Sequence, residues 1–205
     1  MRKELVIALR VTAVTLVLTG LVYPLVTTGL AQVLFPWRAD GSFVKDERGR
    51  VVGSELLGQG FTSPSYFHPR PSAAGKDGWD PTSSSATNLG PTSKKLRDSA
   101  TEAQQKLAAE NPGARGPAPV ELVTSSGSGL DPHLSPAAAL WQVPRVARAR
   151  QVSEERVRML VESSTERRDL LVLGEPRVNV LALNLALDRQ FGAPRAGGTA
   201  ATRVP

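Results

Sequence analysis

The longest apolar stretch of this 205-residue chain lies near its beginning, at residues 11–37, and contains no charged side chain. A bilayer core of about 30 Å requires roughly 20 apolar residues in a helix that rises about 1.5 Å per residue. A buried core helix is the alternative, but such helices rarely run so far without a polar face. The pattern therefore predicts a membrane-spanning helix that tethers one domain.

The flank before this stretch, residues 1–10, carries three basic residues, Arg2, Lys3 and Arg10. It could be the start of a signal peptide cleaved after Ala31, but the uncharged stretch continues beyond Ala31, which favours an uncleaved anchor. Basic residues on a short flank orient a helix, whereas long domains cross the membrane largely regardless of charge. We therefore expect residues 1–10 in the cytoplasm and the domain outside it.

Two features of the predicted helix suggest that it also packs against other helices. Pro24 should kink or loosen the backbone, and in lipid such a break needs a neighbouring helix to satisfy it. Thr12, Thr15, Thr19 and Gly20 lie near one face, and small or hydroxyl side chains let helices approach closely. A lone anchor with incidental threonines is the alternative.

The remainder of the chain mixes helical and strand patterns. Apolar pairs at residues 43–44 and 51–52 flank a polar centre, which predicts a hairpin. Short apolar runs predict strands at residues 120–124 and 170–173. Four helices are expected, with Thr92 or Ser93 capping the first and Ser135 the second; they cover residues 93–110, a segment from Pro136 that Pro144 breaks or kinks, residues 153–165 and residues 178–191.

These elements define the expected organisation. Residues 1–10 form a short flank, residues 11–37 the membrane helix, residues 38–191 one mixed α+β domain, and residues 192–205 a tail with the small, polar composition of disorder. The segment at residues 61–72 is rich in proline and aromatic residues and should be irregular but packed. Within it, His68 beside Arg70 is more typical of a hydrogen-bonded structural group than of a ligand or base.

Composition excludes several kinds of site. The chain has a net charge of +6, and the part after residue 37 has +4, but no stripe mixes many basic residues with aromatics, so a nucleic-acid partner is not expected. The chain contains no cysteine, which excludes disulfides, thiolate zinc sites and cysteine nucleophiles. It contains two histidines, which makes a histidine-based metal site improbable, so no metal is expected.

Residues 125–133, with the sequence SSGSGLDPH, hold the most chemically suggestive side chains. Ser126 or Ser128, Asp131 and His133 are the residue types of a nucleophilic triad. A triad usually draws its members from separate elements, and no G-x-S-x-G elbow is present, which argues against a hydrolase.

The same segment has two further interpretations. Backbone N–H groups of a glycine-rich turn between a strand and a helix can bind an anion, but Gly127 and Gly129 are not followed by the Lys-Ser/Thr of a P-loop. A structural turn, in which glycine supplies a positive φ and Asp131 caps the turn, explains the composition better. We predict that Asp131 and His133 are structural, as are Asn88 and Gly90 in the loop-like NLGP stretch.

Five segments resemble one known family, in the same order along the chain. The strongest is LVTSSGSGLDPHLSP, which resembles the signature of the C subunit (KdpC) of the Kdp high-affinity potassium-transporting P-type ATPase. The resemblance covers nearly everything before the tail and includes the single N-terminal membrane helix. The other four segments are GQGFTSPSYFHPRPSA (58–73), NLGPTS (88–93), QVPRVARAR (142–150) and PRVNVLALNLALD (176–188).

The sequence departs from the family in two places. The family's S-G-G-S-N stretch before N-L-G-P is Ser-Ser-Ala-Thr-Asn at residues 84–88, so a role that needs glycine there is in doubt. Ser125 also stands where the family often has alanine.

The resemblance implies a non-catalytic accessory subunit in the bacterial inner membrane. Its partners would be a potassium-channel-like subunit and an ATP-hydrolysing subunit, and it would support assembly and possess no activity of its own. The family has been regarded as a chaperone that raises the ATP affinity of the hydrolytic subunit, so ATP would be met through the complex, with no cofactor firmly bound. The candidate nucleotide-binding residues carried over from the family are Ser126, Gly127, Ser128, Gly129 and Gln142. A membrane-anchored extracytoplasmic binding module is the alternative function.

Overall fold

The apolar stretch forms one long helix. In the computed structural model, which describes residues 1–46 and 48–194, three elements run on without interruption: α1 (Arg2–Val17), a π-helical turn η1 (Leu18–Val22) and α2 (Tyr23–Leu34). Within the 33 residues Arg2–Leu34, a window of 18 residues reaches a mean hydropathy of 2.3, and no residue of the helix is buried within the structure. The helix is therefore long and apolar enough to cross a membrane. It ends before Trp37, which lies in the short helix α3 (Pro36–Ala39), because a residue that precedes a proline disfavours the helical conformation.

The local loosening expected near Pro24 is present as the turn η1. Pro24 has no N–H to donate to the carbonyl four residues earlier, and the backbone widens just before it, so that Tyr23 N–H donates to the Leu18 carbonyl. Thr19 Oγ1 donates to the Thr15 carbonyl at 2.8 Å, and Thr27 Oγ1 donates to the Tyr23 carbonyl at 2.8 Å. The threonine hydroxyls thus bind the backbone of their own helix.

The chain divides into two units, Met1–Phe43 and Val44–Pro205. The second unit begins in the expected hairpin, in which β1 (Phe43–Lys45) pairs with β2 (Val51–Ser54). Asp46 closes the hairpin, because its Oδ1 accepts the backbone N–H groups of Arg48 and Arg50 at 2.9 Å each.

A second, three-stranded sheet has the order β3-β5-β4 and is antiparallel throughout. Its strands are only two or three residues long: β3 (His133–Leu134), β4 (Thr165–Glu166) and β5 (Arg177–Asn179). Val178, in the central strand, faces both Leu134 and Thr165 across the sheet. The pairing places β3, which follows residues 125–132, beside β5, which directly precedes the last helix of the domain.

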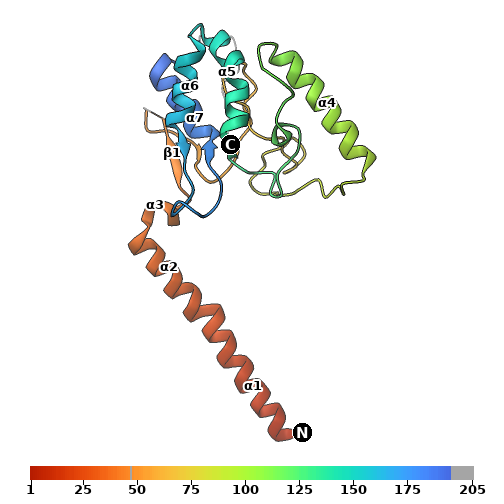
Figure 1. The fold of residues 1–205 in the computed structure, drawn as a ribbon. Coiled ribbons are helices and arrows are strands. Elements are labelled where there is room, and N and C mark those ends of the chain that lie inside the picture. Colours follow the sequence, from red (N-terminus) through yellow and green to blue (C-terminus); the bar gives the residue numbers. More distant parts are fainter. Residues whose placement is uncertain (47, 195–205) are drawn as a thin grey trace. The chain divides into compact units, whose positions relative to one another are not determined.

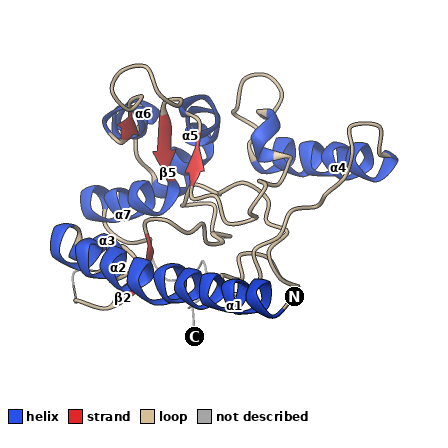
Figure 2. Ribbon diagram, turned by 90° about the horizontal axis from the view of Figure 1, so that it is seen from below, coloured by secondary structure: helices blue, strands red, loops and turns tan. Residues whose placement is uncertain are grey.

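Four helices complete the domain: α4 (Lys94–Glu110), α5 (Pro136–Arg150), α6 (Glu154–Ser163) and α7 (Val180–Phe191). The expected N-caps are confirmed, because Ser93 Oγ accepts the Leu96 N–H at 3.4 Å and Ser135 Oγ accepts the Ala138 N–H at 3.2 Å. The α+β class is therefore confirmed, with the helices outweighing the short strands (Figure 2).

The core lies where α5, α6 and α7 meet the three-stranded sheet (Figure 1). α5 contributes most of it and is buried on nearly all sides, whereas α4 contains no buried residue and stands apart from the other helices (Figure 1). The segment at residues 61–72 is packed as expected, because Phe61 and Phe67 are buried in the same core. The other fully buried members include Leu134, Val143, Val146, Val157, Val161, Val178, Leu183 and Leu187.

Both predictions of a strand from a short apolar run are wrong. Residues 120–124 instead contain a 3-10 turn, η2 (Val120–Leu122), in which Leu122 alone is buried. Residues 170–173 form a turn closed by a single bridge between Asp169 and Leu173. Each run was too short for its apolar content to specify a partner strand, and local turn hydrogen bonds prevailed.

Three helix boundaries also differ from the prediction. The helix expected to reach residue 165 ends at Ser163, because Thr165 pairs with Val178 in the sheet. Pro144 does not break α5, which continues to Arg150 and ends at Gln151 in the left-handed conformation. Burial of Arg145, Val146 and Ala147 beyond the proline offsets the local cost of the missing hydrogen bond. The last helix begins at Val180, not at residue 178, because residues 177–179 pair in the sheet and Asn179 then caps α7. Of the expected disordered tail, residues 195–205 lie outside the described residues.

Candidate functional site

The segment at residues 125–133, hereafter the signature loop, connects η2 to β3 and is stabilised by its own serines. Ser126 Oγ accepts the Gly129 N–H at 2.9 Å, and Ser128 Oγ accepts the Leu130 N–H at 3.1 Å. Ser126 is buried, whereas Gly127 and Ser128 are exposed at the turn. The two hydroxyls therefore hold the loop in shape by accepting backbone donors.

The signature loop is also bound to two other loops. The Ser128 carbonyl accepts hydrogen bonds from Ser84 Oγ and Ser85 N, each at 3.0 Å, and the Gly129 carbonyl accepts one from Ser72 Oγ at 2.6 Å. Gly129 has a φ of +69°, and a Cβ there would lie 2.5 Å from the Ser85 carbonyl oxygen. Only glycine fits this position, because the backbone conformation and the neighbouring chain both exclude a side chain.

The departure from the family at residues 84–88 causes no backbone conflict. Of these five residues, Asn88 alone has a positive φ, +52°, which asparagine tolerates better than most residues. Ser84 and Ser85 instead contribute the hydrogen bonds to Ser128 described above. Gly90 has an ordinary φ and open space where a Cβ would be.

Asp131 and His133 form a local cluster with Arg70. Asp131 Oδ1 accepts the His133 N–H at 3.0 Å and lies 3.5 Å from His133 Nδ1, while Asp131 Oδ2 pairs with Arg70 Nη1 at 3.2 Å. Burial raises the pKa of the Asp131 carboxyl, but the His133 hydrogen bonds and the Arg70 charge outweigh it and lower the pKa below its usual value. Among the described residues, no hydrogen bond joins the His133 ring to Ser126 or Ser128, so the triad is not assembled.

Gln142 lies on α5 with 1% of its surface exposed. Its Oε1 accepts the His68 N–H at 2.9 Å and Arg145 Nη2 at 2.6 Å, and its Nε2 donates to the His68 carbonyl at 3.0 Å. The side-chain amide therefore pairs with the backbone of His68 as a strand neighbour would. None of these bonds involves the signature loop. Among the described residues, Gln142 is therefore not hydrogen-bonded to residues 126–129, the other part of the nucleotide site that the resemblance implies.

Arg145 extends the same network. Its Nη1 donates to the carbonyls of Pro64 at 2.7 Å and Tyr66 at 2.9 Å, and its Nε donates to Asn111 Oδ1 at 3.0 Å. Burial, together with the neighbouring Arg145 charge, lowers the pKa of His68 to about 4. His68 is therefore neutral near pH 7, and its Nε2 lies 3.0 Å from the Ser63 carbonyl oxygen.

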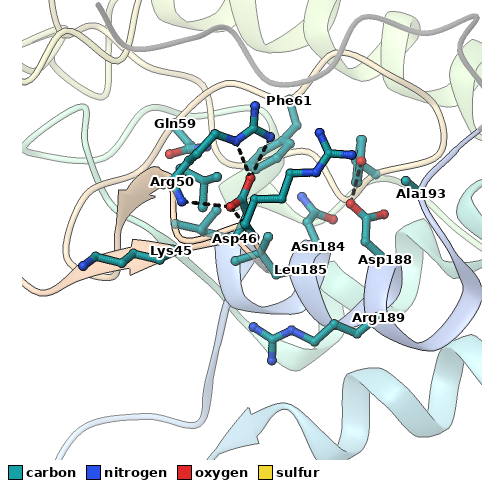
Figure 3. Close-up of a pocket in the computed structure, with 14 residues that line it drawn as sticks. Lys45, Asp46, Arg50, Gln59, Phe61, Asn184, Leu185, Asp188, Arg189 and Ala193 are labelled. Carbon is teal, nitrogen blue, oxygen red and sulfur yellow. Dashed lines mark hydrogen bonds and ion pairs between the residues drawn. The ribbon is translucent and has the colours of Figure 1, made fainter.

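A cavity of about 610 Å³ lies between the hairpin, residues 59–66 and α7 (Figure 3). Two carboxylates line it, and each is paired with an arginine. Asp46 binds Arg50 at 2.7 Å, and Asp188 binds Arg150 at 2.7 Å while accepting the Tyr66 hydroxyl at 2.8 Å. Burial and the Asp188 hydrogen bond raise the pKa of Tyr66 to about 12. These lining groups stabilise one another and leave no unpaired carboxylate as a general base.

Among the described residues, no group of three or more histidine, aspartate or glutamate side chains could hold a metal ion. The arrangement as a whole is a set of loops whose polar side chains bind one another and the neighbouring backbone.

Comparisons with known proteins show the family of the chain. A family model described as "K+-transporting ATPase, c chain" (KdpC) matches residues 5–189. The chain belongs to the KdpC family. The match includes the apolar helix and the domain through α7.

Individual KdpC relatives are similar over almost their whole length. The potassium-transporting ATPase KdpC subunit of Myxococcus xanthus is 63% identical over 198 residues, which cover 94% of this chain and 93% of the relative. The KdpC subunits of Rhodopseudomonas palustris (strain BisB5) and Koribacter versatilis (strain Ellin345) are 56% and 53% identical and cover 92% of this chain each, with 98% and 95% of the relatives covered.

Sequence reasoning missed Arg145, Asn184 and the structural role of Gln142, which join the KdpC-like segments. Arg145 and Gln142 in the segment at 142–150 bind the backbone of the segment at 58–73, and Asn184 in the segment at 176–188 does the same through bonds of 2.8 and 3.0 Å with Phe67. The signal that could have found Gln142 and Asn184 was a single amide side chain within an apolar helix, because a buried amide needs hydrogen-bond partners.

Proposed function

We propose that this chain is a non-catalytic subunit of a potassium-importing P-type ATPase complex. Its membrane helix and its rigid domain would bind the potassium-channel-like and the ATP-hydrolysing subunits and keep the complex assembled. The KdpC family membership over residues 5–189 is the observation that carries the proposal. The chemistry of the domain supports it, because its cavity carboxylates are paired with arginines and its Ser, Asp and His residues are bound within separate turns.

The same geometry bears on ATP. Gln142 is buried, and its amide is bound to His68 and Arg145. This supports an indirect role in which any effect on ATP affinity passes through coupled conformations of the membrane subunits. We therefore expect that Gly127→Ala, at an exposed position with open space for a methyl group, leaves the KM for ATP of the assembled complex unchanged. A raised KM in a complex of normal composition would indicate direct nucleotide contact and overturn the indirect role.

We place the chain in the bacterial inner membrane, with the domain outside the cytoplasm. The argument is the short basic flank, which carries Arg2, Lys3 and Arg10. ATP is cytoplasmic, and a bilayer core of roughly 30 Å would then separate it from the signature loop. This placement agrees with the indirect role in ATP binding.

The assembly role is tested by purifying the complex from cells with and without this chain. We expect that complexes lacking the chain lose subunits in mild detergent and lose potassium-stimulated ATP hydrolysis. Equal hydrolysis and composition without the chain would refute the proposal. If the chain were instead an independent binding module, it would purify without the pump subunits, and their hydrolysis would not depend on it.

The orientation is tested with single cysteines, because the chain has none of its own. Thr92→Cys and Ser163→Cys are at exposed positions of the domain, and Glu4→Cys provides the matched control on the short flank. A membrane-impermeant maleimide applied to spheroplasts should label the first two positions and not the third. Labelling of Glu4→Cys alone would place the domain in the cytoplasm.

A further inference from the structure

The cavity between the hairpin and α7 has an apolar floor. Phe61 and Leu181 are buried in its lining, and Val52 and Leu185 are half-buried there. Its volume of about 610 Å³ falls in the range of pockets that receive a ligand. The floor therefore offers apolar surface that an incoming group could cover.

The rim of the same cavity is basic. Lys45, Arg48 and Arg189 line it with exposed side chains. Lys45 comes from β1 and Arg189 from α7, so both walls of the cavity contribute cations (Figure 3). We call the cavity with this apolar floor and these three cations the basic pocket.

The carboxylates of the basic pocket do not neutralise the three rim cations. Asp46 pairs with Arg50 and Asp188 with Arg150, each at 2.7 Å. Within residues 1–46 and 48–194, no ion pair involves any of the three rim cations. Glu47 lies outside the described residues, and its single charge could offset only one of the three. The pocket therefore keeps an excess of positive charge at its rim.

An apolar centre within a charged rim is the arrangement of a protein interface. A small inorganic anion would leave the apolar floor uncovered, and a purely apolar group would leave the rim cations without partners. An acidic segment that also carries an apolar side chain satisfies both parts. The relatives of this chain are named as subunits of a potassium-transporting ATPase, so the chemistry fits a segment of another subunit.

We propose that the basic pocket receives a segment of another subunit of the potassium-transporting ATPase. An apolar side chain of that segment enters the cavity, and neighbouring Asp or Glu carboxylates pair with Lys45, Arg48 and Arg189. This inference rests on the proposed function, which places the chain in the complex, and it adds the surface and the chemistry of one contact. Because the rim charges are exposed, they contribute more to the specificity and rate of association than to affinity.

Zero-length coupling with a carbodiimide tests the contact in the assembled wild-type complex, because this reagent joins a lysine amine only to a carboxylate that touches it. We expect Lys45 to be linked to an Asp or Glu of another subunit, with an apolar residue next to that carboxylate in sequence. Lys45→Arg keeps the charge and removes the amine, so this link should disappear. Lys95, exposed on α4 and remote from the pocket lining, is the internal control and should form no such link.

Charge reversal tests whether the rim cations hold the segment. Arg48→Glu combined with Arg189→Glu should lower the yield of the Lys45 link about tenfold, because the new carboxylates repel those of the partner. Lys95→Glu combined with Arg97→Glu makes the same change in charge on exposed positions of α4 and should leave the yield unchanged. In the wild type, raising choline chloride from about 0.05 M to about 0.5 M should lower the yield without any substitution, because salt screens exposed charges.

The remaining outcomes overturn the proposal. If the complex is assembled but Lys45 forms no link, or is linked only within its own chain, this inference fails while the proposed function stands. A link that neither the Arg48 and Arg189 reversal nor salt weakens would show that the rim cations do not hold the segment. If the chain does not purify with the pump subunits at all, the proposed function fails and this inference fails with it.

Discussion

Gly129→Ala should strongly destabilise the domain, while Gly127→Ala, two residues away, should not. At Gly129 the φ of +69° costs a non-glycine residue about 1–2 kcal/mol. A Cβ would also lie 2.5 Å from the Ser85 carbonyl oxygen and 2.8 Å from the Ala74 nitrogen, and these backbone atoms can move only if two loops separate. Forcing an extra carbon into packed surroundings typically costs another 1–3 kcal/mol, so we expect a loss of about 3 kcal/mol. At Gly127 nothing lies within 4 Å, and the change should stay within about 0.5 kcal/mol.

Thermal unfolding of the full chain in detergent measures both effects. Tryptophan fluorescence is the suitable signal, because the membrane helix contributes helical circular dichroism that does not report on the domain. Trp79 is a local reporter, since its backbone N–H donates to Ser72 Oγ, and the Ser72 hydroxyl in turn donates to the Gly129 carbonyl. For a domain of this size about 3 kcal/mol corresponds to a fall in Tm of roughly 6–12 °C. Equal Tm values for the two variants would refute the reasoning, because it rests entirely on the difference between their surroundings.

Three further predictions follow from the domain and the helix. The pKa of His68 is about 4 in the folded chain and about 6.5 when unfolded, so between these pH values the unfolded state binds more protons. The free energy of unfolding should therefore fall by about 3 kcal/mol as the pH is lowered from 6.5 to 4. His68→Gln should flatten this pH dependence in denaturant titrations. Asp131→Asn keeps the acceptor for His133 but loses the pair with Arg70, so stability should fall by about 1 kcal/mol and activity only in proportion to assembly; a fully assembled, equally stable complex without turnover would contradict a structural role. Replacing residues 11–34 by leucines should lower the yield of assembled complex in mild detergent, and an unchanged yield would argue against specific helix packing.

Local signals predicted much of the architecture. The caps at Ser93 and Ser135 were visible because a cap is a contact within three residues, and the hairpin closed by Asp46 is equally local. The three-stranded sheet was not predicted, since strands of two or three residues carry almost no periodic pattern. Their register depends on Val178 packing between distant segments.

The candidate site shows the same division. The glycine requirement at residue 129 could be anticipated from the turn composition, but the cause of it, the approach of Ser85 and Ala74, is a tertiary contact. The role of Gln142 could not be derived from the sequence, because its partner, His68, lies 74 residues away and no pattern near Gln142 indicates that contact. A polar residue in a buried helix signals that a partner exists without identifying it.

The buried Arg145 has a further consequence. Its guanidinium is surrounded by oxygen atoms from Pro64, Tyr66, Asn111 and Gln142, and among the described residues no carboxylate forms an ion pair with it. This is the coordination that small domains often obtain from a structural metal ion, with carbonyl oxygens converging on a positive charge. Here the cation is covalently attached to α5, so neither dilution nor a chelator can remove it. The positive charge that holds the proline-rich segment is therefore present whenever α5 is folded, without any metal ion taken up from the surroundings.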